Sequence, residues 1–326
     1  MDVLSDLCAC PRCGGALPHW HCRGCGLRYD TFGGVPNLRV AADARTERVR
    51  QFYEAAPFPG YPPRDSLQAL RARAERSQFV RLLDDAIPGD ARILEVGCGT
   101  GQMSLYLARA DRVVIGADLS RSSLLLAAAA ARRFGLDRVG FVETDLNRSG
   151  FRTGAFDVIV CSGVLHHTPE PRASFARIVP LARPGGVIVL GLYNAIARIP
   201  LRMRRLVARL TGYRWVPFDP VLQDRRHEPD RRLAWLRDQY QHPEEHRHTI
   251  AEVQQWFHEN DVAYLSTYPT VLIGDRTRDL FAPAADNWRI EGWLTQLGWI
   301  RSLGHEGGLF VTIGRREGSV MNANGP

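Results

Sequence analysis

The chain contains no lysine, and all 42 of its basic residues are arginine. Base-composition bias in a genome explains this more simply than selection for arginine chemistry. The formal net charge of +7 is therefore weak evidence for a nucleic-acid partner. Long apolar runs are also lacking, since the longest, residues 124–131, lies inside a helical pattern. The first residues include Asp2 and Asp6 and no apolar signal region, so we expect a cytoplasmic protein without a transmembrane segment.

What is present is the composition of an ordinary globular protein. Hydrophobic residues make up 45% of the chain and charged residues 24%. A length of 326 residues is enough for one large core and a small extra module. The seven cysteines are distributed unevenly, with five in the first 25 residues. In a cytosolic chain this clustering favours a metal site over disulfides.

The stretch at residues 92–102 organises the rest of the chain. An apolar run at residues 93–96 is long enough for a buried parallel strand. Three glycines follow it at once, Gly97, Gly99 and Gly101, and apolar residues then resume at helical spacing. The pattern predicts a strand, a tight turn and a helix. Glycines in such a turn allow unusual dihedral angles and let the backbone approach a ligand closely.

The spacing of these glycines argues against a dinucleotide fingerprint. That fingerprint needs a third glycine at position 102, where this chain has Gln102. Glu95 closes the strand, and a carboxylate there suits a cationic amine better than a pyrophosphate. The run Glu-Val-Gly-Cys-Gly-Thr-Gly resembles motif I of the class I S-adenosylmethionine (SAM) methyltransferases, which implies that SAM is the cofactor. The alternative is a structural turn in another kind of α/β protein.

The strand-helix alternation continues beyond the glycine turn. Asp118 and Leu119 end the second predicted strand, residues 113–119, and an acid there accepts hydrogen bonds from both ribose hydroxyls in related nucleotide-binding folds. The resemblance also implies that Asp145 binds the adenine amino group and that Leu146, at the end of the third strand, flanks the ring. Either acid could instead be a solvated residue at a strand end.

The fourth predicted strand, residues 156–161, leads into the run Val-Leu-His-His-Thr-Pro. This run resembles the motif after strand four in the methyltransferase branch that includes quinone C-methylases. The resemblance implies that Ser162 faces the methionine part of SAM and that His166 or His167 faces the substrate or covers the cofactor. Tyr193 follows the fifth strand and should border the acceptor, so it joins the two histidines as a candidate catalytic residue. A purely structural role for the histidines is the alternative.

Two Cys-x-x-Cys knuckles stand near the start of the chain, each followed by glycine. They supply the thiolates of Cys10, Cys13, Cys22 and Cys25, which together satisfy tetrahedral Zn²⁺. A segment this short has too little core to fold unaided, so we expect a structural zinc ion rather than a redox pair or a decayed site. The first 40 residues resemble the zinc ribbons of some bacterial rRNA methyltransferases and of small proteins that activate methyltransferases.

The resemblance to class I methyltransferases covers residues 90–193 and extends more weakly to 316. It implies an α/β, Rossmann-like sheet of seven mostly parallel strands with helices on both faces and an antiparallel seventh strand. The sequence also predicts one helix over residues 67–87, an alanine-rich helix capped by Ser120 that runs to Phe134, a turn at 183–186, a basic helix over 195–213 and a helix capped by Thr249. We expect these units: a zinc ribbon, 1–40; a helical, proline-rich bridge over the cofactor site, 41–90; the SAM-binding core, 91–194; a cap insertion, 195–248; the rest of the sheet, 249–316, with a second insertion, 275–305; and a flexible tail, 317–326.

Three functions fit these features. The first is methylation of a small or lipidic metabolite held under the two insertions. The second is methylation of tRNA or rRNA gripped by the zinc ribbon and by Arg198, Arg202, Arg204, Arg205 and Arg209, although such a run can also bind lipid headgroups or simply face solvent. The third is a non-catalytic SAM-binding regulator or partner. We favour the first, because aromatic residues in the insertions suit an apolar pocket: Trp215, Phe218, Trp288, Trp293 and Trp299. The acceptor atom stays open between N, O and C, and the oligomeric state is undetermined.

Overall fold

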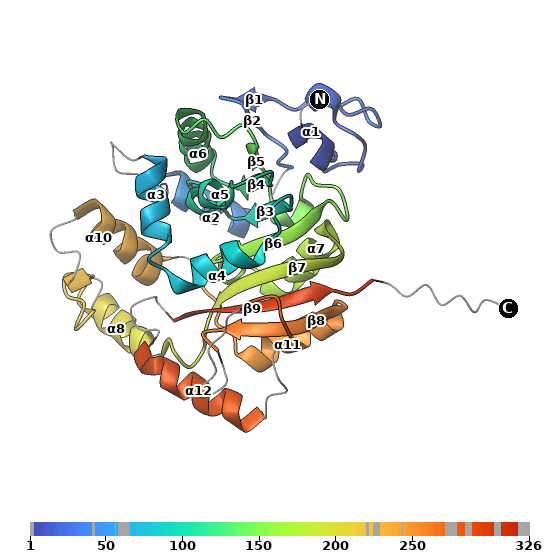
Figure 1. The fold of residues 1–326 in the computed structure, drawn as a ribbon. Coiled ribbons are helices and arrows are strands. Elements are labelled where there is room, and N and C mark those ends of the chain that lie inside the picture. The colour runs from blue at the N-terminus through green and yellow to red at the C-terminus, as the bar shows by residue number, and fades with distance from the viewer. Residues whose placement is uncertain are drawn as a thin grey trace.

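The computed structural model describes residues 3–40, 43–55, 57, 66–219, 222–223, 229–242, 244–270, 279–283, 289–302 and 308–318. Within these residues, seven strands form one sheet in the order β5-β4-β3-β6-β7-β9-β8 (Figure 1). The pairs from β5 to β7 are parallel, and β9 is antiparallel to both of its neighbours. The expected α/β class with a mostly parallel seven-stranded sheet is therefore confirmed. The strands are β3 (Arg92–Val96), β4 (Val113–Asp118), β5 (Val139–Glu143), β6 (Phe156–Ser162), β7 (Ala182–Tyr193), β8 (Val262–Tyr268) and β9 (Leu309–Arg316).

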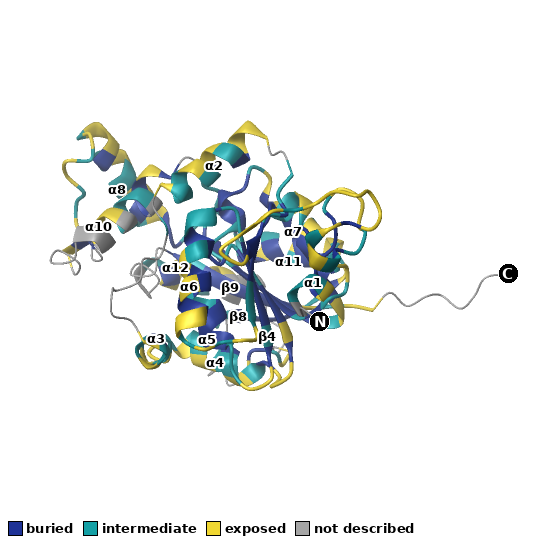
Figure 2. Cartoon of the chain, turned by 90° about the horizontal axis from the view of Figure 1, so that it is seen from above, coloured by how far each residue is buried: buried dark blue, intermediate teal, exposed yellow. Residues whose placement is uncertain are grey.

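Helices cover both faces of this sheet, with a hydrophobic core on each side (Figure 2). One face is covered by α3 (Leu67–Ala74), α4 (Gln78–Ala86), α5 (Gln102–Leu107) and α6 (Arg121–Arg133). The other is covered by α7 (Pro171–Ile178) and α11 (Ile250–Glu259). Successive residues of β3 point to opposite faces, so Ile93 and Leu94 belong to different cores and both are fully buried. Burial on both faces explains why these strands read as continuous apolar runs.

Local sequence signals set several helix boundaries as expected. The Ser120 hydroxyl accepts a hydrogen bond from the Ser123 N–H and begins α6. Thr249 accepts one from the Glu252 N–H and begins α11. Each cap satisfies an N–H group that lacks a partner within the helix.

Three local expectations differ in detail from the structure. The predicted helix over 67–87 is two helices, α3 and α4, because the Ser77 side chain caps a new start at Gln78 by accepting from the Val80 N–H. The predicted turn at 183–186 falls inside the bounds of β7, but Gly185 has a φ of 77° and the regular pairing with β6 begins at Val187, where the predicted strand begins. The third strand ends at Glu143 instead of residue 146, because Asp145 caps a short turn, η2 (Leu146–Arg148).

The cysteine-rich segment packs against the β5 side of the sheet. It contains α1 (Val3–Leu7), η1 (Pro18–Trp20), β1 (Thr31–Phe32) and β2 (Val35–Pro36). Isolated bridges join Cys8 to Phe151 and Asn37 to Glu143, and the Leu38 N–H donates to the Glu143 carbonyl at 2.8 Å. Cys8 and Leu38 are fully buried in cores shared with the sheet. The ribbon therefore covers an edge that would otherwise expose unpaired backbone groups.

Further helical segments lie toward the opposite side of the sheet from the ribbon (Figure 1). They are α8 (Ile199–Leu210), α10 (Pro229–Leu236), the π-helical turn η5 (Arg237–Gln241) and α12 (Arg289–Ser302). The helix α2 (Ala44–Glu54) begins at Asp43, whose side chain accepts from the Arg45 and Thr46 N–H groups. None of the helices in the described ranges combines the length and the apolar character that crossing a bilayer requires.

Candidate functional site

The glycine turn joins the carboxyl end of β3 to α5, as the sequence predicts. Gly97, Gly99 and Gly101 all have positive φ, at 68°, 52° and 73°. A Cβ added at Gly97 would clash with Val164, and one added at Gly101 would lie 2.7 Å from a carbon of Phe141. The protein's own packing therefore requires glycine at these two positions, whatever ligand the turn binds.

Asp118 ends the neighbouring strand β4 and is held by the turn itself. Its Oδ2 accepts a hydrogen bond from the Gly99 N–H at 2.8 Å, and its Oδ1 accepts one from the Ser120 N–H at 2.8 Å. Burial raises the pKa of Asp118 above its usual range, and these two N–H donors oppose that rise. Each oxygen keeps a second lone pair, so the carboxylate is oriented and still able to accept hydrogen bonds from a ligand. Leu119 follows directly.

Glu95 lies one residue before the end of β3 and accepts a hydrogen bond from the Ser104 hydroxyl on α5. Burial raises the pKa of Glu95 to about 7, the Ser104 hydrogen bond opposes the rise, and the nearby Asp118 adds to it. Sequence reasoning missed Ser104, and the only available signal was a hydroxyl in the first turn of the helix after the glycines. Two neighbouring, partly buried carboxyl groups favour a cationic ligand.

The other residues assigned to the cofactor have structural partners already. Asp145 is buried, and its side chain accepts from the Asn147 N–H at 2.8 Å, which caps the short turn containing Leu146. Ser162 ends β6, and its hydroxyl fills the space beside Gly191, where an added Cβ would clash with it. The roles of these three residues toward SAM stay predictions.

The sequence-predicted catalytic residues come together in the structure. His166 and His167 lie in a short 3-10 turn, η3 (Leu165–His167), directly after β6. The ring of His166 stacks on the ring of Tyr193, with centroids 3.7 Å apart. All three side chains are buried. The carboxyl ends of two adjacent parallel strands, β6 and β7, bring them side by side, which is where such sheets bind ligands.

Two further segments gather around this histidine pair. The ring of His242 lies 3.6 Å from that of His167, and the Glu244 carbonyl lies 2.8 Å from His167 Nδ1. Phe52 and Tyr53, in the last turn of α2, lie 5.1 and 5.6 Å from the His242 ring. The same turn of α2 meets the start of α6, because the Ser120 hydroxyl donates to the Tyr53 carbonyl at 3.4 Å. The end of α2 therefore lies between the Asp118 region and the histidine pair; residues 56 and 58–65 of the expected bridge fall outside the described residues.

The arginines of the basic helix do not all face solvent, contrary to expectation, because Arg198 is buried. Only 1% of its surface is exposed, and its guanidinium carbon lies 3.6 Å from the Tyr193 ring centroid. Arg198 and Arg205 both donate to Glu245 Oε2, at 2.9 and 3.0 Å. Gln239 connects this ion pair to the site, because it accepts from Arg198 at 2.8 Å and donates to the Tyr193 hydroxyl at 2.6 Å. Sequence reasoning gave none of these roles, since the partners lie about forty residues away along the chain.

Burial controls the charge of the two histidines. It lowers the pKa of His166 well below its usual range and that of His167 to about 3, so both rings are neutral near pH 7. Among the described residues, both nitrogens of His166 and Nε2 of His167 lack a hydrogen-bond partner although they are buried. Such atoms are suited to a ligand that supplies the missing partner. An imidazole with so low a pKa holds a proton weakly, so the geometry favours orienting an acceptor over removing its proton outright.

The aromatic residues of the insertions do not gather into one pocket, contrary to expectation. Trp299 is buried in the main core beside Phe310, with ring centroids 6.0 Å apart. Trp215, Phe218 and Trp293 have exposed fractions of 57%, 79% and 58%. The fifth predicted residue, Trp288, lies outside the described residues.

The four predicted zinc ligands also meet. Their sulfur atoms all lie within 4.8 Å of one another; those of Cys10 and Cys25 are 3.7 Å apart, and those of Cys13 and Cys22 are 3.4 Å apart. Tetrahedral Zn²⁺ with Zn–S bonds of about 2.3 Å requires sulfur atoms about 3.8 Å apart, so the cluster fits the ion. In the parts of the chain that the structure describes, no other group of histidine, cysteine or acidic side chains has such an arrangement.

Comparison with known proteins agrees with this geometry. Residues 94–190 match a family described as "Methyltransferase domain". The central part of this chain is therefore similar to a methyltransferase domain. An uncharacterized protein of Synechococcus sp. is 28% identical over 265 residues, which is 73% of this chain and 62% of that protein. Ubiquinone biosynthesis O-methyltransferase of Cronobacter sakazakii is 31% identical over 107 residues, which is 33% of this chain and 44% of that enzyme. The chain thus spans less than two thirds of the length of each of these relatives.

Solved structures resemble a larger part of the chain, but more loosely. Magnesium protoporphyrin IX methyltransferase from Synechocystis PCC 6803, with bound SAM, is 16% identical with a TM-score of 0.47. That likeness covers 85% of this chain and 100% of the other. Geranyl diphosphate C-methyltransferase from Streptomyces coelicolor A3(2) is 14% identical with a TM-score of 0.49, over the same shares of the two chains.

Proposed function

We propose that this methyltransferase-domain protein transfers a methyl group from SAM to a small or lipidic acceptor. The observation that carries the proposal is the geometry of Asp118. Its carboxylate is fixed by an N–H of the glycine turn and by an N–H at the start of α6, at the carboxyl ends of adjacent parallel strands. Sheets of this kind bind nucleotide-type ligands at that edge. Glu95, beside it, offers a partly buried carboxyl group for a cationic amine.

Each predicted residue then has a role toward SAM. Asp118 accepts hydrogen bonds from the ribose hydroxyls, and Glu95 pairs with the ammonium group of the methionine part. Asp145 and Leu146 hold the adenine ring, and Ser162 lies at the methionine end. When bound, SAM supplies a methyl group on a sulfonium, which is already a good leaving group. The protein's task is therefore mainly to position the acceptor in line with the methyl group.

His166, His167 and Tyr193 form the floor on which we place the acceptor. The buried, unpartnered nitrogens of the two histidines would exchange hydrogen bonds with its hydroxyl or amine group. The floor is enclosed by His242 and by the last turn of α2, which suits a compact or slender acceptor.

RNA is the second candidate, and the placement of the arginines counts against it. Arg198 and Arg205 are engaged with Glu245 and are not available to phosphates. RNA binding needs a continuous basic track beside its stacking residues. The third candidate, a non-catalytic SAM-binding partner, shares the whole cofactor site and differs only in the absence of methyl transfer.

We also propose that the cysteine cluster holds one structural Zn²⁺. Four thiolates leave no open coordination position, so the ion would carry no chemistry. Its contribution would be to hold the ribbon against the β5 edge.

Calorimetric titration with SAM and S-adenosylhomocysteine tests the cofactor assignment. Asp118→Ala should weaken binding by about 1.5–3 kcal/mol, the scale of hydrogen bonds to a charged group. Asp118→Asn keeps the shape of the side chain and is the variant to use if the alanine form unfolds. Asp111→Asn, just before the opposite end of the same strand, is the matched control and should bind as the wild type does. Unchanged affinity in both Asp118 variants, or tight binding of NAD, would refute the assignment.

Incubation with methyl-labelled SAM and cell extract, with and without ribonuclease, tests the acceptor. Label in a solvent-extractable, ribonuclease-resistant product is the expected result. Label lost on ribonuclease treatment would establish RNA as the acceptor instead. SAM binding with no transfer to any fraction would favour the regulator.

A further inference from the structure

The helix α8 presents an apolar stripe to solvent. The exposed fractions of its side chains are 44% for Ile199, 62% for Met203, 54% for Leu206 and 80% for Leu210. At roughly 100° of rotation per residue, these four positions fall within an arc of about 60°. Leu201 and Ala208, which are buried, fall on the opposite side of the helix. The stripe therefore points directly away from the body of the protein.

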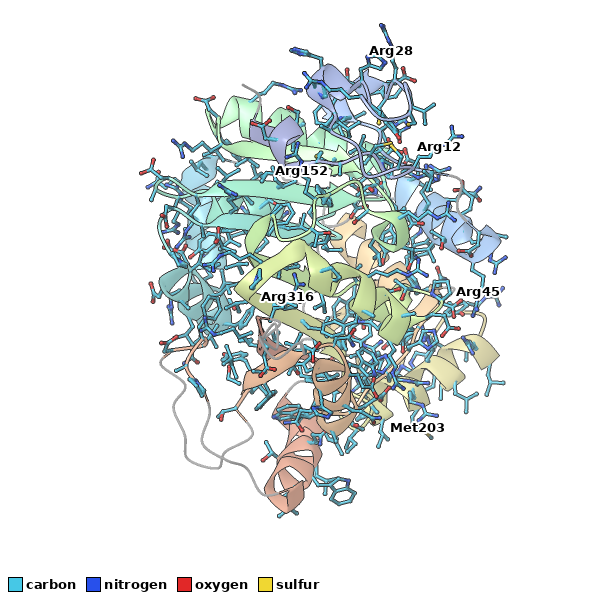
Figure 3. The ribbon with its side chains drawn as sticks, turned by 90° about the vertical axis from the view of Figure 1, so that its right-hand side faces the viewer. Arg12, Arg28, Arg45, Arg152, Met203 and Arg316 are labelled. Carbon is cyan, nitrogen blue, oxygen red and sulfur yellow. The ribbon has the colours of Figure 1, made fainter. Side chains whose placement is uncertain are left out.

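The position of α8 in the molecule agrees with this reading. The helix lies at the margin of the structure, away from the central sheet (Figures 1 and 2). Met203 stands at the surface in the side-chain view (Figure 3). Two large aromatic side chains follow soon after the helix, Trp215 and Phe218, and both are exposed. Exposed apolar side chains gathered on one face in this way mark an interaction site.

The charged residues of α8 and of the segment that follows it are all of one sign. No aspartate or glutamate occurs between Glu170 and Asp219, and residues 195–218 contain six arginines. Arg202 and Arg209 are exposed and lie beside the stripe on one flank of the helix. The protein as a whole carries a formal net charge of +7. The surface that complements the stripe must therefore be apolar within and anionic at its boundary.

We propose that α8 and the aromatic segment after it, residues 211–218, dock the protein onto an anionic lipid surface. The helix would lie in the plane of the interface, with the stripe at the level of the upper acyl chains and the arginines against lipid phosphates. A second copy of the chain is a poorer occupant, because it would bring two arginine-flanked surfaces together. RNA is poorer as well, because the stripe would face its phosphates without apolar partners.

Docking through α8 also bears on the acceptor. Arg198 immediately precedes α8 and contacts the Tyr193 ring at the floor of the site. A helix seated on a bilayer would hold that floor next to the lipid phase, from which a lipid-soluble acceptor could enter. This step rests on the proposed function, whereas the docking itself does not.

Flotation of the full chain with lipid vesicles tests the docking. Phosphatidylcholine vesicles with and without phosphatidylglycerol are the probes. The wild-type protein should float with the anionic vesicles, bind the neutral ones more weakly, and lose affinity as salt increases. Combining Met203→Ser, Leu206→Ser and Leu210→Ser should lower the partition coefficient on the order of a hundredfold, from the loss of buried apolar area. Combining Arg202→Gln and Arg209→Gln should lower it roughly tenfold or more and reduce the salt dependence.

Two matched controls separate docking from general surface effects. Leu126→Ser removes a leucine that is 45% exposed on α6, and Arg138→Gln removes an exposed arginine far from α8 in the sequence. Both should float as the wild type does. Because the stripe is exposed, the triple variant should unfold at the wild-type midpoint. If it does not, Leu210→Ser alone, at the most exposed position of the stripe, replaces it.

Several results would overturn the proposal. Wild-type protein that stays with the soluble fraction at every lipid composition would do so, as would a triple variant that floats unchanged. A lipid-free dimer that Leu210→Ser dissociates, without any vesicle binding, would make the stripe a protein interface. Loss of RNA binding in the triple variant, again without vesicle binding, would assign the stripe to RNA. SAM affinity measured without vesicles reports on the proposed function separately.

Discussion

Replacing Glu95 with glutamine should stabilise the ligand-free protein and weaken its binding of SAM at the same time. The Glu95 carboxyl is partly buried, accepts a hydrogen bond from Ser104 and lies near Asp118. Loss of hydration is the main reason that its pKa rises from the ordinary 4.5 to about 7. Glutamine has nearly the same shape and can still accept from Ser104, but it carries no charge. The substitution therefore removes the electrostatic cost and the cation-binding charge together.

The size of the effect follows from the pKa. A rise from 4.5 to about 7 corresponds to about 3 kcal/mol. The folded state holds the Glu95 proton more tightly than the unfolded state does. The free energy of unfolding therefore falls as pH rises from about 4.5 to about 7, and the full cost is present above about 7. At about pH 8, Glu95→Gln should raise the free energy of unfolding by about 1–3 kcal/mol, after the cost of burying the amide. At about pH 5 the gain should be less than about 1 kcal/mol.

Urea unfolding at these two pH values, together with calorimetric titration of SAM near neutral pH, measures both effects. The affinity of the variant for SAM should fall by about 1.5–3 kcal/mol, because an amide cannot pair with an ammonium group as a carboxylate does. Glu259→Gln is a useful control. Arg172 lowers the pKa of Glu259, so removing the negative charge of Glu259 should not stabilise the protein. The reasoning is refuted if Glu95→Gln destabilises the protein equally at both pH values and binds SAM as the wild type does.

Three further changes test other parts of the structure. Changing Cys10 and Cys13 together to serine should abolish zinc retention in elemental analysis and lower the unfolding temperature, because the ribbon covers a sheet edge; retained metal would contradict the four-cysteine site. Glu245→Ala should reduce the free energy of unfolding by about 3–5 kcal/mol in urea, because Arg198 loses its buried partner, and a loss under about 1 kcal/mol would show that the ion pair matters little. Gly97→Ala should cost at least about 2 kcal/mol in thermal unfolding, since it adds positive-φ strain and a clash with a valine side chain; a wild-type midpoint would contradict this.

Local patterns were sufficient to predict the scaffold of the site. The apolar runs of the central strands, the glycine turn and the caps at Ser120 and Thr249 each depend on residues within a few positions of one another. The meeting of Asp118 with the turn could also be anticipated. In a parallel sheet, adjacent strands end at the same edge, so strand order alone brings the two together. The meeting of the four cysteine thiols was also predictable, because the spacing of the cysteines encodes both knuckles.

Only the tertiary structure decided what surrounds that scaffold. Whether an arginine of the basic helix faces water or the interior depends on Glu245, which follows Arg198 by 47 positions. No local periodicity encodes such a partner, so the sequence pattern could not show that Arg198 packs on Tyr193. The exposed stripe of α8 was hidden for the same reason. Apolar residues at helical spacing predict an amphipathic helix. The ion pairs of Arg198 and Arg205 with Glu245 hold the side opposite the stripe against the protein, so the stripe is the side that faces solvent.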